Sequence, residues 1–139
     1  MITTLTSRQA EALPDLRRRR ERAHTQLIVT RAAWLMPDER SLVRTVFEEA
    51  KTVAEVARLA RESPREVRRR VRRLVARVTA PAFAFVADHR DAWPAPRRQI
   101  ATSVILQGRT LRETSRFLRL PYHTVRTEMN VVAALMRQG

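Results

Sequence analysis

The chain has 139 residues, no cysteine and a formal net charge of +14. The missing cysteine excludes disulfides, a thiolate nucleophile and a cysteine-based zinc site. So large an excess of cations favours nucleic acid or another anionic surface as a partner, and says little about the fold. Lys51 is the only lysine, and the guanidinium group of arginine binds phosphate and guanine edges through two hydrogen bonds at once. A GC-rich genome would produce the same bias without any function.

Apolar residues recur at intervals of three to four residues and only two glycines occur, which is typical of an all-α fold. The prolines lie between the apolar segments or begin them, where a missing N–H costs little. The predicted helices, in chain order, span roughly residues 15–34, 38–49, 52–61, 64–79, 96–107, 110–119 and 121–137. A short helix or loop is predicted at 81–92, and the linker is predicted at Asp88–Pro96.

Residues 1–35 form a basic N-terminal segment. Its clustered arginines are expected to contact phosphate groups: Arg17, Arg18, Arg19, Arg20 and Arg22. The alternative is a charged helix face whose other side packs onto the next module. We expect packing for residues 27–35 and phosphate contact for residues 17–22.

Residues 36–88 and 89–139 are predicted to be two copies of one small helical module, because the sequence repeats with an offset of 58 residues. The matching positions are Arg40 and Arg98, Val46-Phe47 and Val104-Ile105, Thr52–Glu55 and Thr110–Glu113, Arg58 and Arg116, and Val67-Arg68 and Val125-Arg126. Two copies are too few for a solenoid, so a tandem pair of modules is the better interpretation.

Each copy contains the signature of two capped helices joined by a short turn. Thr52 and Thr110 precede apolar-periodic segments and have a glutamate three residues later, which is the pattern of a capping box. Ser63 and Pro64 begin the next helix of the first copy in the same way. The expected packing places Val56, Leu59 and Ala60 on Val67, Val71 and Leu74, and Phe117 and Leu118 on Val125, Met129 and Val132. The pattern predicts tandem helix-turn-helix modules of three or four helices, whose second helices present their N-terminal residues to a DNA major groove.

Residues 36–78 resemble region four of bacterial sigma factors and the similar LuxR-type regulators, whose pattern is T-x-x-E-I-A-x-x-L-G-x-S-x-x-T-V followed by basic residues. Residues 96–136 resemble a second such unit. Arg61 and Arg119 stand where the family has a turn glycine, so the turn either takes left-handed strain or bends differently. Nothing resembles the sigma segment that binds and melts the −10 element, so a complete sigma factor is not expected.

The first predicted recognition helix, residues 64–77, carries seven arginines and one glutamate. Its expected DNA-binding residues are Arg65, Arg68, Arg69, Arg72 and Arg73, and Arg77 is expected to contact a backbone phosphate. Arg73 also suits a backbone contact. The alternative is a solvated helix face, although such faces normally interleave acids for ion pairs. Glu66 either completes the cap or accepts from a cytosine amino group, and we favour the cap.

The second predicted recognition helix is chemically mixed. Its expected DNA-binding residues are Tyr122, His123, Thr124, Arg126, Thr127 and Asn130, a set of donors, acceptors and a methyl group that can discriminate bases. The alternative is a polar surface that contacts protein. His123 has no ligand-spaced histidine partner, so no metal site is expected.

These patterns predict a bacterial transcription regulator and not an enzyme, with DNA as partner and no cofactor or metal. The sigma resemblance adds RNA polymerase as a partner. The alternative function is a polymerase-associated elongation or antitermination factor, similar to the regulators of gene transfer agent clusters, that uses its helical modules as protein docks. No signal peptide opens the chain, and the apolar run Thr79–Ala87 is too short to cross a bilayer, so we expect a cytoplasmic, nucleoid-associated protein without membrane partners.

Overall fold

The computed structural model of the protein describes residues 7–139, with side chains from residue 15 onward. Every regular element in this part of the chain is helical, so the predicted all-α fold is confirmed. The first set of elements is α1 (Ser7–Arg31), η1 (Ala32–Trp34), α2 (Pro37–Val43), η2 (Arg44–Glu48), α3 (Val53–Ala60) and α4 (Pro64–Thr79). The second set is α5 (Pro81–His89), η3 (Arg90–Ala92), α6 (Ala95–Ala101), η4 (Thr102–Leu106), α7 (Leu111–Leu118) and α8 (Tyr122–Gln138).

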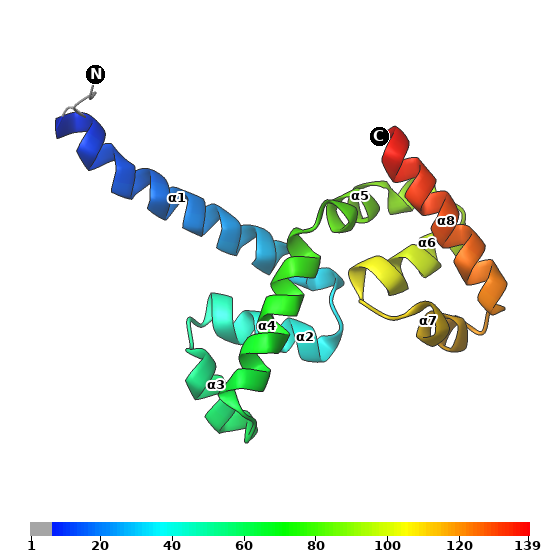
Figure 1. Cartoon of the computed structure of the whole chain (residues 1–139), viewed down its shortest axis with the longest axis horizontal. Helices are drawn as coiled ribbons and strands as arrows, with labels where there is room; N and C mark the ends of the chain where they lie inside the picture. Colours follow the sequence, from blue (N-terminus) through cyan, green and yellow to red (C-terminus); the bar gives the residue numbers. More distant parts are fainter. Residues whose placement is uncertain (1–6) are drawn as a thin grey trace.

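The two sets, here called the first unit (α1–α4) and the second unit (α5–α8), correspond element by element. From η1 onward each helix of the first unit has a counterpart that begins 58 residues later in the second. The likeness extends to irregular features, because η1 and η3 are 3₁₀ turns whereas η2 and η4 are π-helical. In Figure 1 the units lie side by side, joined where α4 leads into α5, and α1 extends away from both.

The predicted linker at Asp88–Pro96 is wrong for most of its length. Helix α5 runs to His89 and η3 follows at once. Pro94 and Pro96 do not break the chain there, because Pro94 is the N-cap of α6 and Pro96 lies in its first turn. The first N–H groups of a helix have no partner within the helix, so proline loses nothing at such a position.

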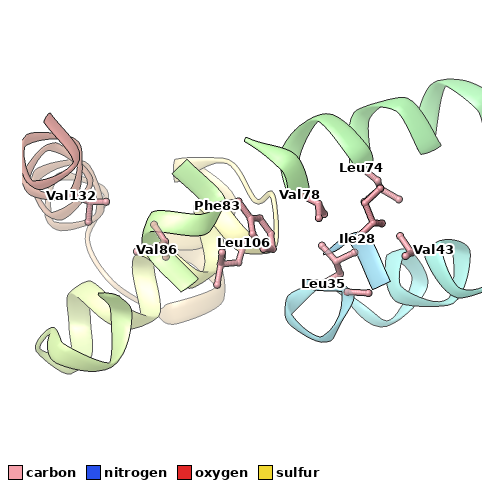
Figure 2. Packing of buried hydrophobic residues seen from close by; sticks show 11 residues of the cluster. Ile28, Leu35, Val43, Leu74, Val78, Phe83, Val86, Leu106 and Val132 are labelled. Carbon is pink, nitrogen blue, oxygen red and sulfur yellow. The ribbon is translucent and has the colours of Figure 1, made fainter. Parts of the chain in front are cut away.

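A continuous apolar core holds the units together. In Figure 2 the buried side chains form a row from the first unit (Ile28, Leu35, Val43, Leu74 and Val78) into the second, where Phe83 and Leu106 lie nearer the first unit and Val86 and Val132 lie farther away. Phe83 lies in this row just after the chain passes from α4 to α5. Full burial of an apolar side chain of this size contributes about 1.5–3 kcal/mol, so the junction is itself part of the core.

The turns that follow α3 and α7 take left-handed strain, the first of the two outcomes expected for an arginine in place of glycine. Arg61 has φ 56° and ψ 40°, and Arg119 has φ 55° and ψ 45°. In both turns the next amide closes the helix, with Glu62 N–H donating to the Ala57 carbonyl at 2.9 Å and Leu120 N–H to that of Ser115 at 3.0 Å. This is the Schellman geometry usually built on glycine.

The expected packing between the paired helices is wrong at Ala60, which is exposed, and at two equivalent positions of the units. The side chain of Leu59 is 66% exposed and that of Phe117 is 59% exposed. Ala57 and Thr114 are buried instead, because they lie on the faces that α3 and α7 turn inward. Inside the second unit the Thr114 hydroxyl shares a 2.8 Å hydrogen bond with that of Ser103, which satisfies both buried groups.

The caps form largely as predicted. In the second unit the box is complete: the Glu113 N–H donates to the Thr110 hydroxyl at 3.1 Å, and the Thr110 N–H donates to the Glu113 carboxylate at 3.0 Å. In the first unit the Thr52 hydroxyl accepts from the Glu55 N–H at 3.1 Å, but the carboxylate lies against that hydroxyl rather than the backbone. The second unit therefore has the better-closed helix start.

Candidate nucleic-acid interface

Four arginines make one exposed face of α4, here called the α4 arginine face: Arg65, Arg68, Arg69 and Arg72. They follow one another at helical spacing, so their side chains gather on one side while Val67, Leu74 and Val78 are buried on the other. Together they line a surface hollow of about 390 Å³. Four like charges around one hollow repel one another, so the face is suited to bind an anion.

A single acid stands beside this face. The Glu66 carboxylate lies 3.5 Å from the Arg69 guanidinium, and both side chains are exposed. The Ser63 hydroxyl accepts from the Glu66 N–H at 3.4 Å, so the helix is capped by the serine. The reciprocal cap favoured for Glu66 is wrong, because its carboxylate is drawn to Arg69 instead.

The remaining arginines of α4 lie on a different side. Arg70 is paired with Glu62 at 2.6 Å, and Arg73 is exposed beside it. Arg77 is paired with Glu39 at 2.6 Å, and both side chains are about three-quarters buried. The expectation that Arg77 contacts a phosphate is therefore corrected, because its guanidinium is already held by a carboxylate within the protein.

Helix α8 presents a mixed polar surface. Five of the six residues predicted to bind are exposed on it, namely Tyr122, His123, Arg126, Thr127 and Asn130, whereas Thr124 is half-buried. Val125 and Val132 are buried on the opposite face. Pro121 is the N-cap and offers no side-chain hydrogen bond, so the first turn of α8 keeps amide donors and a partial positive charge for an anion.

Sequence reasoning missed two arginines on α7. Arg112 and Arg116 line a hollow of about 530 Å³ together with Ser115 and Tyr122. The Arg112 guanidinium lies 5.8 Å from the centre of the Tyr122 ring. The signal was present in the sequence as two arginines four residues apart, directly after the cap at Thr110.

The clustered arginines of α1 lie along an exposed part of the helix. Residues 15–24 are all exposed, including Arg17, Arg18, Arg19, Arg20 and Arg22. Further along the helix Ile28 is buried, and Ala32 and Leu35 continue the buried side beyond its end. The expectation that residues 27–35 pack is confirmed for these three. Figure 1 shows the basic part of α1 projecting from the rest of the molecule.

Neither a metal site nor a membrane span stands out in the part of the chain that the structure describes. Its histidines and carboxylates form no group of three or more placed to hold a metal ion. None of its helices combines the length and the apolar character needed to cross a bilayer. No protein-family model, curated protein or solved structure matches this chain.

Proposed function

We propose that this protein is a bacterial transcription regulator that binds DNA through α4 and α8. The observation that carries the proposal is the α4 arginine face, with four exposed guanidinium groups around one hollow and a single acid beside them. A guanidinium that binds a phosphate releases condensed counterions from DNA, which drives association at moderate salt. The net charge of +14 adds long-range attraction to the same partner.

On this proposal α4 supplies affinity and α8 supplies sequence preference. A surface made almost only of arginine binds any DNA backbone, because phosphates carry no sequence information. On α8 one cation, Arg126, stands among the polar side chains of Tyr122, His123 and Thr127. Arginine at such a site can donate two hydrogen bonds to the O6 and N7 atoms of a guanine.

Arg112 and Arg116 extend the proposed interface from α8 onto α7. They flank Tyr122 at the edge of the same hollow, where a backbone phosphate beside the groove would lie within reach of both. In Figure 1, α4 begins at the bottom of the molecule, whereas α8 begins at its right-hand edge, and both run upward. On this proposal one DNA duplex meets the first turns of both helices.

The experiment that tests this function is genome-wide occupancy of the protein in its host, combined with selection of binding sites from random duplexes. We expect discrete peaks at promoters and an enriched motif that purified protein binds. A protein that shows no enrichment for any duplex, and whose affinity does not depend on salt, would contradict DNA binding by these surfaces.

A second candidate function is that of a polymerase-associated elongation or antitermination factor. Leu59 and Phe117 favour it, because each is an exposed large apolar side chain at the same position of its unit, and such side chains suit protein contacts. Occupancy spread through transcribed genes, rather than peaks at promoters, would support this function. So would a Leu59→Ser variant that keeps full DNA affinity but loses regulation in cells.

A further inference from the structure

The two units meet at a contact built around one glycine. Gly108 follows η4, and a Cβ atom added to it would collide with Nη1 of Arg77 and lie 2.7 Å from its Cζ. Arg77 belongs to α4 in the first unit. The backbone of the second unit at Gly108 therefore lies so close to this guanidinium that no side-chain atom fits between them. No real Cβ atom sits that near another heavy atom, so any other residue at 108 would push the guanidinium away.

The equivalent position of the first unit shows that the backbone alone does not require glycine. Gly108 has φ +73°, and Ala50, which stands 58 residues earlier, has φ 56°. The following amide makes the same hydrogen bond in both loops, from Lys51 to Thr45 at 3.1 Å and from Arg109 to Ser103 at 3.0 Å. Alanine can therefore adopt this loop conformation, at the cost that left-handed backbone imposes on any L-residue. Glycine at 108 avoids that cost and also leaves room for the Arg77 guanidinium.

The guanidinium that Gly108 covers is paired with a carboxylate of the first unit. Its Nη2 donates to Oε1 of Glu39 at 2.6 Å, and the same oxygen accepts from the Met36 N–H at 3.4 Å at the start of α2. Arg77 thereby joins α4 to α2 and presents a fixed surface to the second unit. Both charged side chains are about three-quarters buried, so water screens the pair less than it would a surface pair.

Two further arginines cross between the units. Nη2 of Arg109 lies 3.3 Å from the Met36 sulfur, and its guanidinium stacks 3.7 Å from the Phe117 ring centre. The Arg90 guanidinium lies 4.8 Å from the Trp34 ring centre while its Nε donates to Thr102 at 2.9 Å. Each of these side chains has a partner in its own unit and one in the other, which restrains rotation between the units.

We propose that Gly108 and the Arg77–Glu39 pair are positioning residues that set the spacing between two half-sites on DNA, one bound by α4 and the other by α8. The inference rests on the proposed function. Two recognition helices held at one separation bind together only where the half-sites match it, whereas loosely joined units tolerate many spacings. On this proposal, the short distance between Gly108 and the Arg77 guanidinium fixes the relative position of the two units.

The test uses the full chain and the motif obtained by binding-site selection, in duplexes whose two halves are separated by inserted base pairs. Inserting about five base pairs turns one half-site to the opposite face of the helix. We expect this insertion to weaken wild-type binding about a hundredfold, because only one half-site can then be engaged. The Gly108→Ala variant is expected to shift or broaden the spacing preference, because the added Cβ displaces the Arg77 guanidinium at the contact between the units, while its affinity for a single half-site stays unchanged.

Ala50→Gly is the matched control. It changes the same loop position of the first unit and leaves the contact between Gly108 and Arg77 unaltered. It should keep the wild-type spacing profile. A measurement without DNA accompanies it: amide hydrogen exchange at residues 36–40 and 106–110 should quicken in Gly108→Ala and not in Ala50→Gly, with both variants folded by circular dichroism.

Three results would overturn the inference. Wild-type protein that binds the motif equally at every spacing would refute the positioning role while leaving DNA binding intact. A Gly108→Ala variant with the sharp wild-type profile and unchanged exchange would refute the role of this contact. Wild-type protein that binds no duplex at all would remove the proposed function, and with it the spacing role.

Discussion

A left-handed arginine ends α3 and another ends α7, and each is held in a conformation that costs an L-residue about 1–2 kcal/mol. Replacing Arg61 or Arg119 with glycine removes this strain but loosens the unfolded chain. We expect each substitution to stabilise the protein by about 0.5–1 kcal/mol, measured by chemical denaturation. Arg58→Gly, in the exposed last turn of α3, should instead destabilise it by up to about 1 kcal/mol. Equal changes in stability for the glycine variants at positions 58 and 61 would contradict backbone strain at Arg61.

Glu113 makes the stability of the fold depend on pH. The backbone N–H of Thr110, followed by its hydroxyl, holds the pKa of the Glu113 carboxyl below its ordinary value of 4.5. Because the folded-state pKa is lowered, the carboxylate stabilises the fold above the ordinary pKa, and this stabilisation is lost as the pH falls through the lowered value. Glu113→Gln should therefore be less stable than wild type at pH 7, and the difference should vanish in acid.

The matched control for this effect is Glu55→Gln, because the first unit lacks the bond from the threonine N–H to the carboxylate. Thermal unfolding of both variants across the acidic range would measure the two differences side by side. A Glu113→Gln variant whose loss of stability is the same at pH 3 and pH 7 would show that the carboxylate plays no part in the cap.

At the scale of single helices, α4 and α8 differ in the side chains that they expose. The α4 arginine face is nearly uniform in charge, whereas α8 carries one exposed cation among mixed polar side chains in its first turns. On the proposed function this difference separates affinity from sequence preference. Helix α1 is divided as well, since its exposed basic part precedes a part that enters the core.

Substitutions on the two helices should therefore have unlike effects. Arg68→Ala combined with Arg69→Ala should weaken binding to all duplexes and lower the steepness of the salt dependence by about two. Arg126→Ala should cost about 1–3 kcal/mol for the preferred motif and relax the preference at one base pair. Arg70→Ala is the control on α4, because Arg70 is paired with Glu62 and lies off the arginine face; it should change affinity little.

The Arg126→Ala variant also discriminates between the two candidate functions. If it leaves DNA affinity and base preference intact but abolishes regulation in cells, α8 contacts protein. The polymerase-associated function would then be favoured, and DNA binding would be confined to α4 and α1. Fluorescence anisotropy with the selected motif measures DNA affinity, and reporter expression in the host measures regulation.

At the scale of the whole molecule, the net charge of +14 dominates the approach to an anionic partner. If Arg17–Arg20 and the exposed arginines of α4 neutralise about six phosphates, log affinity should fall against log salt with a slope of about −5. Replacing Arg17–Arg20 with glutamine should make this salt slope less steep by about one for each phosphate that is no longer neutralised. Arg137→Gln, at the far end of α8, is the control and should leave the slope unchanged. A wild-type slope near zero would contradict backbone binding.

Much of the helical layout could be predicted because its signals are local. A threonine with a glutamate three residues later, or a proline in a first helical turn, acts on amides within one turn of chain. The start of α4 at Pro64 and of α7 after Thr110 follow from such pairs. The offset of 58 residues recurs in the helix starts for the same reason, since equal local signals begin equal elements.

The sequence alone therefore determined that the chain is all-helical, strongly basic and internally repeated. Only the tertiary structure decided which side chains the helices turn inward and which arginines stay free. Leu59 is exposed and Ala57 buried because α4 covers one face of α3, and Arg77 is held because Glu39 lies beside it. Gly108 lies against the guanidinium of Arg77, 31 residues earlier in the chain, and its own loop sequence does not reveal this contact. Such contacts join segments far apart in the chain, so no local pattern encodes them.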